Sequence, residues 1–89
     1  MLVLFDKSFS KSLDKLKIAV VKKSIELIIV QIESAGNLKE IGNIKKMEGF
    51  KGFYRIRIGD YRLGFELENA RTVRLIIIAH RKDIYKVFP

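Results

Sequence analysis

Three arginines stand at alternating positions around one short stretch of the chain. Arg55 and Arg57 precede the dipeptide Gly59-Asp60, and Arg62 follows it. A guanidinium group offers paired N–H donors that match the oxygens of a phosphate or a carboxylate. The spacing therefore predicts an anion-binding site. The alternative is a solvated basic face with Glu66 as its acidic partner, although one carboxylate cannot pair with three guanidinium groups.

A second polar group, His80-Arg81-Lys82-Asp83-Ile84-Tyr85, directly follows an apolar run. His80 is the one histidine of the chain, and an imidazole with an ordinary pKa of about 6.5 exchanges protons near neutral pH. Arg81 adds a guanidinium group, and Tyr85 adds a ring that can stack on a base. A lone histidine is more often structural, and Tyr85 can equally pack the last turn against a sheet. Both uses stay open for each residue.

The arginines belong to a predicted β-hairpin from Tyr54 to Leu67. Two alternating runs flank Gly59-Asp60, and a two-residue loop with a leading glycine suits the tight turns that match strand twist. The pairing sets Arg57 opposite Arg62 and Arg55 opposite Gly64, and alternation gives this hairpin a basic face and an apolar face. The apolar face carries Tyr54, Ile56, Ile58, Tyr61, Leu63 and Phe65.

The facing arginines favour function over folding alone. Like charges opposite each other on a sheet are destabilising by about 0.2–1 kcal/mol, so selection for folding alone would rarely set Arg57 beside Arg62. Gly64 leaves room beside Arg55 for a ribose or a phosphate, or else it marks a β-bulge.

Composition limits the class of protein. The 89 residues form one domain, 1–89, and the formal net charge of +8 suits a polyanionic partner, of which nucleic acid is the commonest. There is no cysteine, which excludes disulfides and thiolate metal sites. We expect no metal and no cofactor, because one histidine cannot hold a metal alone.

The apolar runs are too short to cross a membrane. The longest, Leu27 to Val30 and Leu75 to Ala79, fall far short of the roughly 20 residues that a spanning helix needs. The first residues turn polar at Asp6 and lack the basic lead of a secretion signal. We therefore expect a cytoplasmic protein with no membrane contact.

The remaining elements predict an α+β fold. Leu2 to Phe5 reads as a strand, a helix follows from about Ser8 to Lys17, and apolar residues at steps of three and four continue from Ile18 to Ile32. One bent helix and a helical hairpin both fit, and compactness favours the hairpin. A glycine-punctuated basic connector with a possible short strand, Ile44 to Met47, leads to the β-hairpin.

A further strand, Thr72 to Ala79, is apolar enough to lie inside a sheet. The predicted class is α+β, in the order β-α-α-β-β-β. Its two N-terminal helices pack on one face of a small, mainly antiparallel sheet, and the arginines lie on the other face.

Two segments of the chain resemble the RelE/ParE superfamily of toxins. They are Tyr54-Arg55-Ile56-Arg57-Ile58-Gly59-Asp60-Tyr61-Arg62 and, after a further strand, His80-Arg81-Lys82-Asp83-Ile84-Tyr85. The order of helices and strands resembles this superfamily along the whole chain. The resemblance implies a RelE-like type II toxin. Such a protein is a metal-independent endoribonuclease that cleaves mRNA on the ribosome, inhibits translation and is held inactive by a cognate acidic antitoxin. The expected partners are this antitoxin, mRNA and the ribosome.

The resemblance also implies a site. The catalytic residues would be Arg62, His80, Arg81 and Tyr85, and Arg55 and Arg57 would bind RNA. We expect Lys46 and Lys51, which belong to the basic connector, to bind RNA as well. RNA cleavage without a metal needs a proton acceptor for the ribose 2′-hydroxyl, cations for the charged phosphorane and an acid for the leaving oxygen. His80 is the first candidate for acid or base.

This chain departs from the RelE pattern in three places. Arginines occupy positions 55 and 57, where the best-studied pattern has lysines, and arginine is a poor general base. Ala79 replaces a frequent glycine, and the chain is expected to end before the terminal helix that some members carry. Two other functions stay open: a ParE-like inhibitor of DNA gyrase, and a non-catalytic basic module that binds nucleic acid or an acidic protein.

Overall fold

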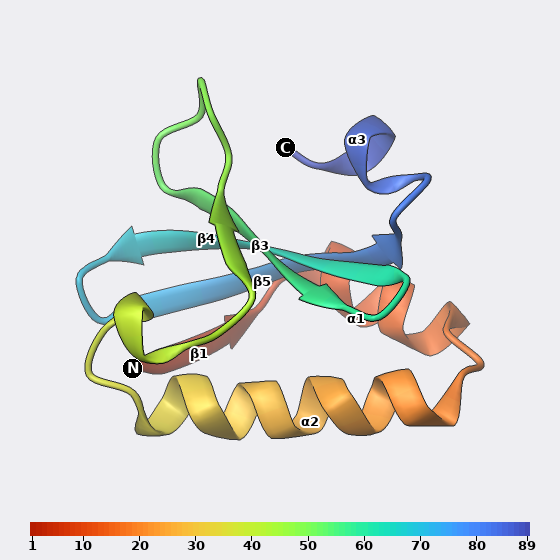
Figure 1. Ribbon diagram of the computed structural model, residues 1–89, viewed down its shortest axis with the longest axis horizontal. Helices are drawn as coiled ribbons and strands as arrows, with labels where there is room; N and C mark the ends of the chain where they lie inside the picture. Colours follow the sequence, from red (N-terminus) through yellow and green to blue (C-terminus); the bar gives the residue numbers. More distant parts are fainter.

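A five-stranded sheet forms the centre of the computed structural model, which describes residues 1–89 (Figure 1). The strand order is β1-β5-β4-β3-β2, with β1 parallel to β5 and all other pairs antiparallel. The strands are β1 (Leu2–Phe5), β2 (Ile44–Lys46), β3 (Phe53–Ile58), β4 (Tyr61–Asn69) and β5 (Thr72–His80). The predicted mainly antiparallel α+β class is confirmed, and β5 lies inside the sheet as expected.

The β3–β4 hairpin has the predicted register. Arg57 pairs with Arg62, and Arg55 pairs with Gly64. Gly59 has φ +58°, a left-handed conformation that glycine adopts without strain. The turn thus fixes the register, and the register sets the three arginines on one face.

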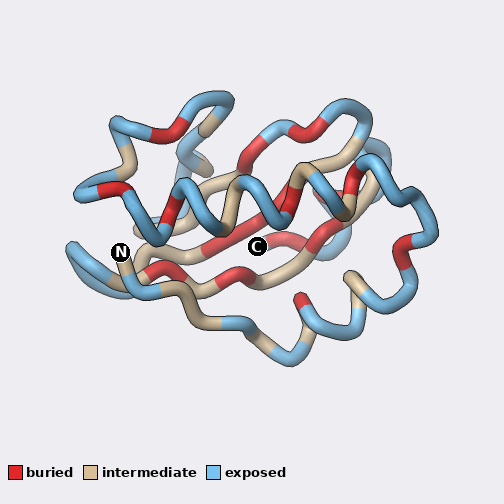
Figure 2. Tube along the Cα trace, turned by 90° about the horizontal axis from the view of Figure 1, so that it is seen from below, coloured by how far each residue is buried: buried red, intermediate tan, exposed pale blue.

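Two helices, α1 (Lys7–Lys15) and α2 (Ala19–Ser34), cover the opposite face of the sheet (Figure 1). The chain is extended at Leu16 and Ile18, so the helical hairpin is confirmed over the single bent helix. Buried positions lie along the strands behind α2 and at intervals on α2 itself (Figure 2). The core between the two layers includes Phe9, Ile25, Ile32, Ile56, Leu63, Phe65, Val73 and Leu75.

Two short helical segments were not predicted. A 3-10 helix, η1, spans Leu38–Glu40, and α3 spans Ile84–Val87. Helix α3 is a single turn of four residues near the end of the chain. Ile84 and Phe88, four residues apart, are both buried, and α3 lies on the side of the sheet opposite α2 (Figure 1).

Phe88 fills the space beside Gly64. Its side chain is 3% exposed, and it meets Phe53 edge to face with ring centroids 5.8 Å apart. A Cβ atom on Gly64 would lie 2.7–2.8 Å from three Phe88 ring carbons. The expectation of room for a ribose or phosphate here is therefore wrong. The bulge alternative is confirmed, because the β4–β5 register shifts between Gly64 and Phe65.

Helix α1 supplies hydrogen-bond partners to the backbone of β5 at this bulge. Gly64 pairs with Ile77 and Phe65 pairs with Leu75, so Ile76 is the extra residue of β5. The Ser8 hydroxyl donates to the Ile76 carbonyl, and the Ile78 N–H donates to the Ser12 hydroxyl at 3.1 Å. Two serines one helical turn apart thus satisfy groups near the irregularity in the strand ladder.

Replacing Ser12 by alanine should therefore lower the free energy of unfolding by about 1–3 kcal/mol, because the partly buried Ile78 N–H loses its acceptor. Denaturant titration measures the change. Ser10→Ala is the matched control, since Ser10 is an exposed serine on the same helix. A loss in Ser12→Ala no larger than in Ser10→Ala would contradict this role, because helix propensity favours alanine at both positions.

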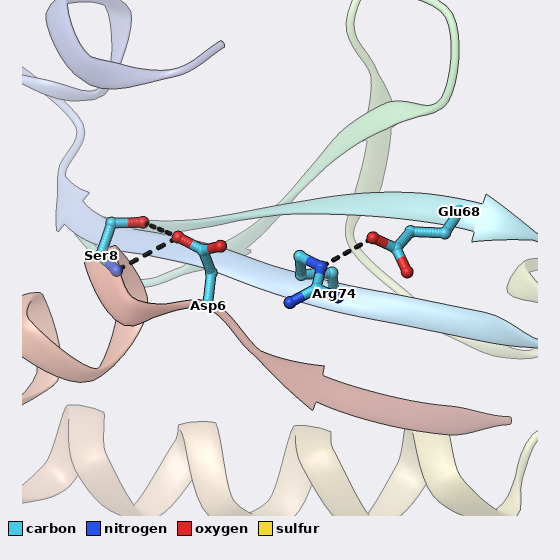
Figure 3. Close-up of polar contacts among 4 residues, drawn as sticks. All are labelled: Asp6, Ser8, Glu68 and Arg74. Carbon is cyan, nitrogen blue, oxygen red and sulfur yellow. Dashed lines mark hydrogen bonds and ion pairs between the residues drawn. The ribbon is translucent and has the colours of Figure 1, made fainter.

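Asp6 caps the N-terminus of α1 (Figure 3). One of its carboxylate oxygens accepts a hydrogen bond from the Ser8 N–H at 3.2 Å and lies 2.6 Å from the Ser8 hydroxyl, whose single proton is shared between this oxygen and the Ile76 carbonyl. The Ser8 hydroxyl first, and then the Ser8 N–H, lower the pKa of Asp6 below its ordinary value of 3.8. Because the folded pKa is the lower one, this contribution to stability is present above the ordinary pKa and is lost as the pH falls through the folded pKa.

Candidate functional site

A pocket lined only by polar side chains lies on the sheet face opposite α1 and α2. We call it the basic pocket. Its volume is about 310 Å³, and its lining residues are Asn43, Lys45, Arg55, Arg57 and Arg62. Strand alternation builds it: Lys45 on β2 pairs with Arg55 on β3, and Arg57 on β3 pairs with Arg62 on β4. Three adjacent strands thus contribute cations to one place.

No acidic side chain neutralises the basic pocket. The structure contains two ion pairs, Arg74 to Glu68 at 2.7 Å and Arg81 to Asp60 at 3.9 Å, and neither involves a lining residue. The Arg74–Glu68 pair lies farther along β4 and β5 (Figure 3). The structure thus does not contain the alternative arrangement, in which Glu66 is the acidic partner of the arginines. Four cations without a partner repel one another, and a bound anion relieves that repulsion.

Arg62 is held in place by the hairpin turn. Its Nη1 donates to the carbonyl oxygens of Gly59 at 2.9 Å and of Tyr61 at 2.8 Å. A guanidinium group has five N–H donors, so the Nε and Nη2 donors stay free for a ligand. The turn therefore orients the Arg62 side chain before any ligand binds.

Helix α3 brings Tyr85 to the edge of the basic pocket. The guanidinium carbon of Arg55 lies 4.8 Å from the centroid of the Tyr85 ring, a cation–π geometry. The ring is nevertheless 69% exposed. A second hollow, about 270 Å³, is lined by Lys45, Lys46, Met47, Glu48, Arg55 and Tyr85. It shares Lys45 and Arg55 with the basic pocket.

The cations around Tyr85 make its hydroxyl more acidic. Hydrogen bonding to Arg55, and then the charge of Arg55, lower the pKa of Tyr85 from its ordinary value of 10.0, and Lys45 and Arg62 add smaller effects. Positive charge lowers a phenol pKa because it stabilises the phenolate. Tyr85 is therefore a side chain at the pocket edge that exchanges a proton more readily than an isolated tyrosine.

We expect one of the three tyrosines to ionise below pH 10 in an ultraviolet absorbance titration, and Tyr85→Phe to remove that transition. In Arg55→Met the Tyr85 transition should move up towards pH 10, because the main stabiliser of the phenolate is gone. Arg71→Met, which changes an exposed arginine in the β4–β5 turn, serves as the control. A Tyr85 transition that does not respond to Arg55→Met would contradict this assignment.

His80 does not join the basic pocket. It pairs with Tyr61 across β4 and β5, and paired residues share a sheet face. Tyr61 packs against the core on the helix-covered side. The His80 ring meets the Tyr61 ring edge to face at 5.4 Å, and its Nδ1 accepts from the Lys82 N–H at 3.1 Å. The structure places His80 on the face opposite the arginines.

The other predicted residues divide between the pocket and its surroundings. Arg81 lies at the hairpin turn, where its N–H donates to the Asp60 carbonyl at 2.8 Å, and it does not line the basic pocket. Lys46 lines the hollow beside Tyr85. Lys51 lies in the β2–β3 loop and lines a further hollow there. The structure thus brings together Arg55, Arg57, Arg62 and Tyr85.

Two lining residues were missed. Lys45 belongs to the possible short strand Ile44 to Met47, but no role in the site was predicted for it. Asn43 has φ +58°, a conformation that asparagine tolerates better than most residues. Its carbonyl accepts from the Arg57 N–H at 3.0 Å and extends the β2–β3 pairing. The sequence Gly42-Asn43 was the available turn signal.

No group of three or more His, Cys, Asp or Glu side chains is placed to hold a metal ion. None of the helices is long and apolar enough to cross a membrane.

A family model described as the ParE toxin of type II toxin–antitoxin systems, parDE, matches residues 3–85. The chain belongs to this toxin family. It is also 40% identical to Toxin RelE3 of Methanocaldococcus jannaschii over 90 residues, which cover all of both proteins. The resemblance to the RelE/ParE superfamily is thereby confirmed, and the protein is a RelE-family toxin of the type II class.

Solved structures agree with this assignment. The toxin resembles a chain of the RelB–RelE antitoxin–toxin complex from Methanococcus jannaschii with a TM-score of 0.82 and 38% identity, over 97% of this chain and 99% of that one. A variant of the Escherichia coli toxin RelE in the free state aligns with a TM-score of 0.70 and 20% identity, over 96% of this chain and 90% of that one. The latter match shows a common fold.

Proposed function

We propose that this toxin is an endoribonuclease that cleaves mRNA on the ribosome without a metal ion and so inhibits translation in the cytoplasm. The observation that carries the proposal is the basic pocket, with four unpaired cations and an acidified tyrosine at its edge. RNA supplies the polyanion that such a pocket attracts, and it also carries the nucleophile for its own cleavage.

The reaction begins when the ribose 2′-oxygen attacks the adjacent phosphorus. A bond forms between the 2′-oxygen and phosphorus, the bond from phosphorus to the 5′-oxygen breaks, and the products are a 2′,3′-cyclic phosphate and a 5′-hydroxyl. Arg57 and Arg62 stabilise the charge that develops on the non-bridging oxygens. Arg62 suits this role because the hairpin turn already fixes its orientation.

Proton transfer is assigned to residues that line the two hollows. The Tyr85 phenolate, whose fraction the lowered pKa increases, takes the proton of the 2′-hydroxyl and becomes the neutral phenol. The Lys45 ammonium group, which lines both hollows, protonates the leaving 5′-oxygen. His80 has no part in this scheme, because it lies on the other face of the sheet. Arg81 supports the hairpin turn and, through it, Arg62.

The partner that holds this toxin inactive is a cognate antitoxin with an acidic segment. Relatives of the toxin have been solved in RelB–RelE complexes, and an acidic segment that folds over the basic pocket would neutralise its unpaired cations. Such a segment and RNA would compete for the same side chains.

Expression of the toxin alone, with mapping of mRNA 5′ ends, tests the function. We expect growth arrest with new ends inside translated regions, and rescue by the antitoxin. Growth arrest with gyrase inhibition and no new ends would assign the toxin to the ParE-like function. Normal growth without new mRNA 5′ ends would support the remaining alternative, a non-catalytic basic module. The identity with a RelE-named toxin over the whole chain favours the first outcome.

A further inference from the structure

A loop of residues 47–52 joins β2 to β3 and projects from the sheet on the side of α3 (Figure 1). Phe50 lies near its tip with a side chain that is 48% exposed, and it is not part of the hydrophobic core cluster. Gly49 and Gly52 have φ values of +80° and +83°, which bend the loop. The Met47 N–H donates to the Phe53 carbonyl at 2.8 Å and closes its base. An aromatic ring is thus presented to solvent on a shaped loop.

This loop is continuous with the basic pocket. A hollow of about 560 Å³ in the loop is lined by Lys46, Met47, Glu48, Gly49, Phe50 and Lys51. It shares Lys46, Met47 and Glu48 with the hollow beside Tyr85, which in turn shares Lys45 and Arg55 with the basic pocket. The three hollows form one track, which we call the basic track. Its cations outnumber its single carboxylate, Glu48.

We propose that the basic track holds a single strand of RNA that extends beyond the cleaved nucleotide, and that Phe50 stacks on one of its unpaired bases. The proposal rests on the proposed function. Single-stranded nucleic acids bind where a positively charged groove follows the backbone and aromatic rings receive the bases. Here the arginines and lysines follow the phosphates, and Tyr85 and Phe50 are the two exposed rings along the track.

The charged side chains around Phe50 favour RNA over an apolar protein groove as its binding partner. Lys46 and Lys51 line the same hollow as the ring together with one carboxylate, Glu48, so an apolar groove would leave at least one ammonium group without water and without a counter-charge. An RNA strand supplies a phosphate for each lysine and a base for the ring. The length of the RNA therefore distinguishes binding at the loop from binding at the basic pocket, because a short oligonucleotide occupies only the pocket.

Fluorescence anisotropy with 2′-O-methyl RNA, which cannot be cleaved through a 2′-hydroxyl, tests the proposal. We expect Phe50→Ala to weaken binding of a nine-nucleotide strand about tenfold, within the range measured for loss of one stacked base, and to leave binding of a three-nucleotide strand unchanged. Phe50→Tyr should restore the affinity. Phe5→Ala, which removes another exposed phenylalanine on the far side of the fold, is the control.

Two further arms identify the contact. Lys46→Gln combined with Lys51→Gln should reduce the salt dependence of binding for the long strand, by about 0.7 in the logarithmic slope for each lost phosphate contact. Abasic substitutions along the nine-nucleotide strand should find one position at which Phe50→Ala has no further effect. That position is the stacked base.

Equal affinity of Phe50→Ala and the unaltered toxin for the long strand would overturn the proposal, as would an equal loss with both lengths. Loss of antitoxin binding in Phe50→Ala, with RNA binding intact, would assign the loop to the antitoxin instead. The binding assay needs no cleavage. A Phe50-dependent length effect in a toxin that cuts no mRNA would therefore keep this inference and reject only the proposed nuclease activity.

Discussion

Arg62→Ala is expected to lower the single-turnover rate of RNA cleavage by about 100- to 1,000-fold, the range for removal of one oriented donor to a developing negative charge. The effect should be large because the Gly59 and Tyr61 carbonyls hold the guanidinium group in a fixed orientation. The same variant expressed alone should no longer arrest growth.

The control for Arg62→Ala is Arg71→Ala, which removes the same charge from an exposed position in the β4–β5 turn. If Arg62→Ala acted only by lowering the net charge, both variants would lower the cleavage rate equally. Arg62→Lys should recover little, because an ammonium group cannot reproduce the planar, bidentate contact with a phosphate. Full toxicity of Arg62→Ala in a folded protein would contradict the role given to this residue.

Gly64→Ala is expected to lower the free energy of unfolding by about 1–3 kcal/mol, because the new methyl group would overlap the Phe88 ring. Displacement of Phe88 should also shift α3, and with it Tyr85, so RNA cleavage should fall as well. Denaturant titration and single-turnover cleavage measure the two effects.

Gly42→Ala is the matched control, because a Cβ atom there would have no atom within 4 Å beyond its own residue and its two chain neighbours. A double-mutant cycle with Phe88→Ala isolates the contact. Removing the ring costs stability by itself, but Gly64→Ala should cost little more once the ring is gone. Additive losses would mean that Gly64 and Phe88 are not coupled.

The β-hairpin could be predicted from the sequence because two independent signals agree there. Alternation divides the residues between two faces, and the Gly59-Asp60 loop selects one register, which places Arg57 opposite Arg62. Apolar spacing likewise predicted helix from about Ser8 to Ile32, and compactness favoured two helices over one bent helix. The clustering of Arg55, Arg57 and Arg62 on one sheet face could therefore be predicted from local patterns alone.

The carboxyl end could not be predicted in this way. Helix α3 has only four residues, and its position depends on Phe88 meeting Gly64, a contact between distant parts of the chain. His80 and Ala79 are neighbours in sequence but lie on opposite sheet faces, and only the β4–β5 register, which includes a bulge, decides which one faces Arg62. The polar residues from His80 to Tyr85, which are contiguous in sequence, therefore do not all lie on the same face of the sheet.

The most direct test uses purified ribosomes, the toxin and an mRNA with one 2′-deoxy nucleotide at the mapped cleavage position. We predict cleavage of the all-ribose mRNA to a 2′,3′-cyclic phosphate and a 5′-hydroxyl, and no cleavage at the deoxy position. Cleavage of the mRNA at the deoxy position would contradict attack by the 2′-oxygen within the basic pocket.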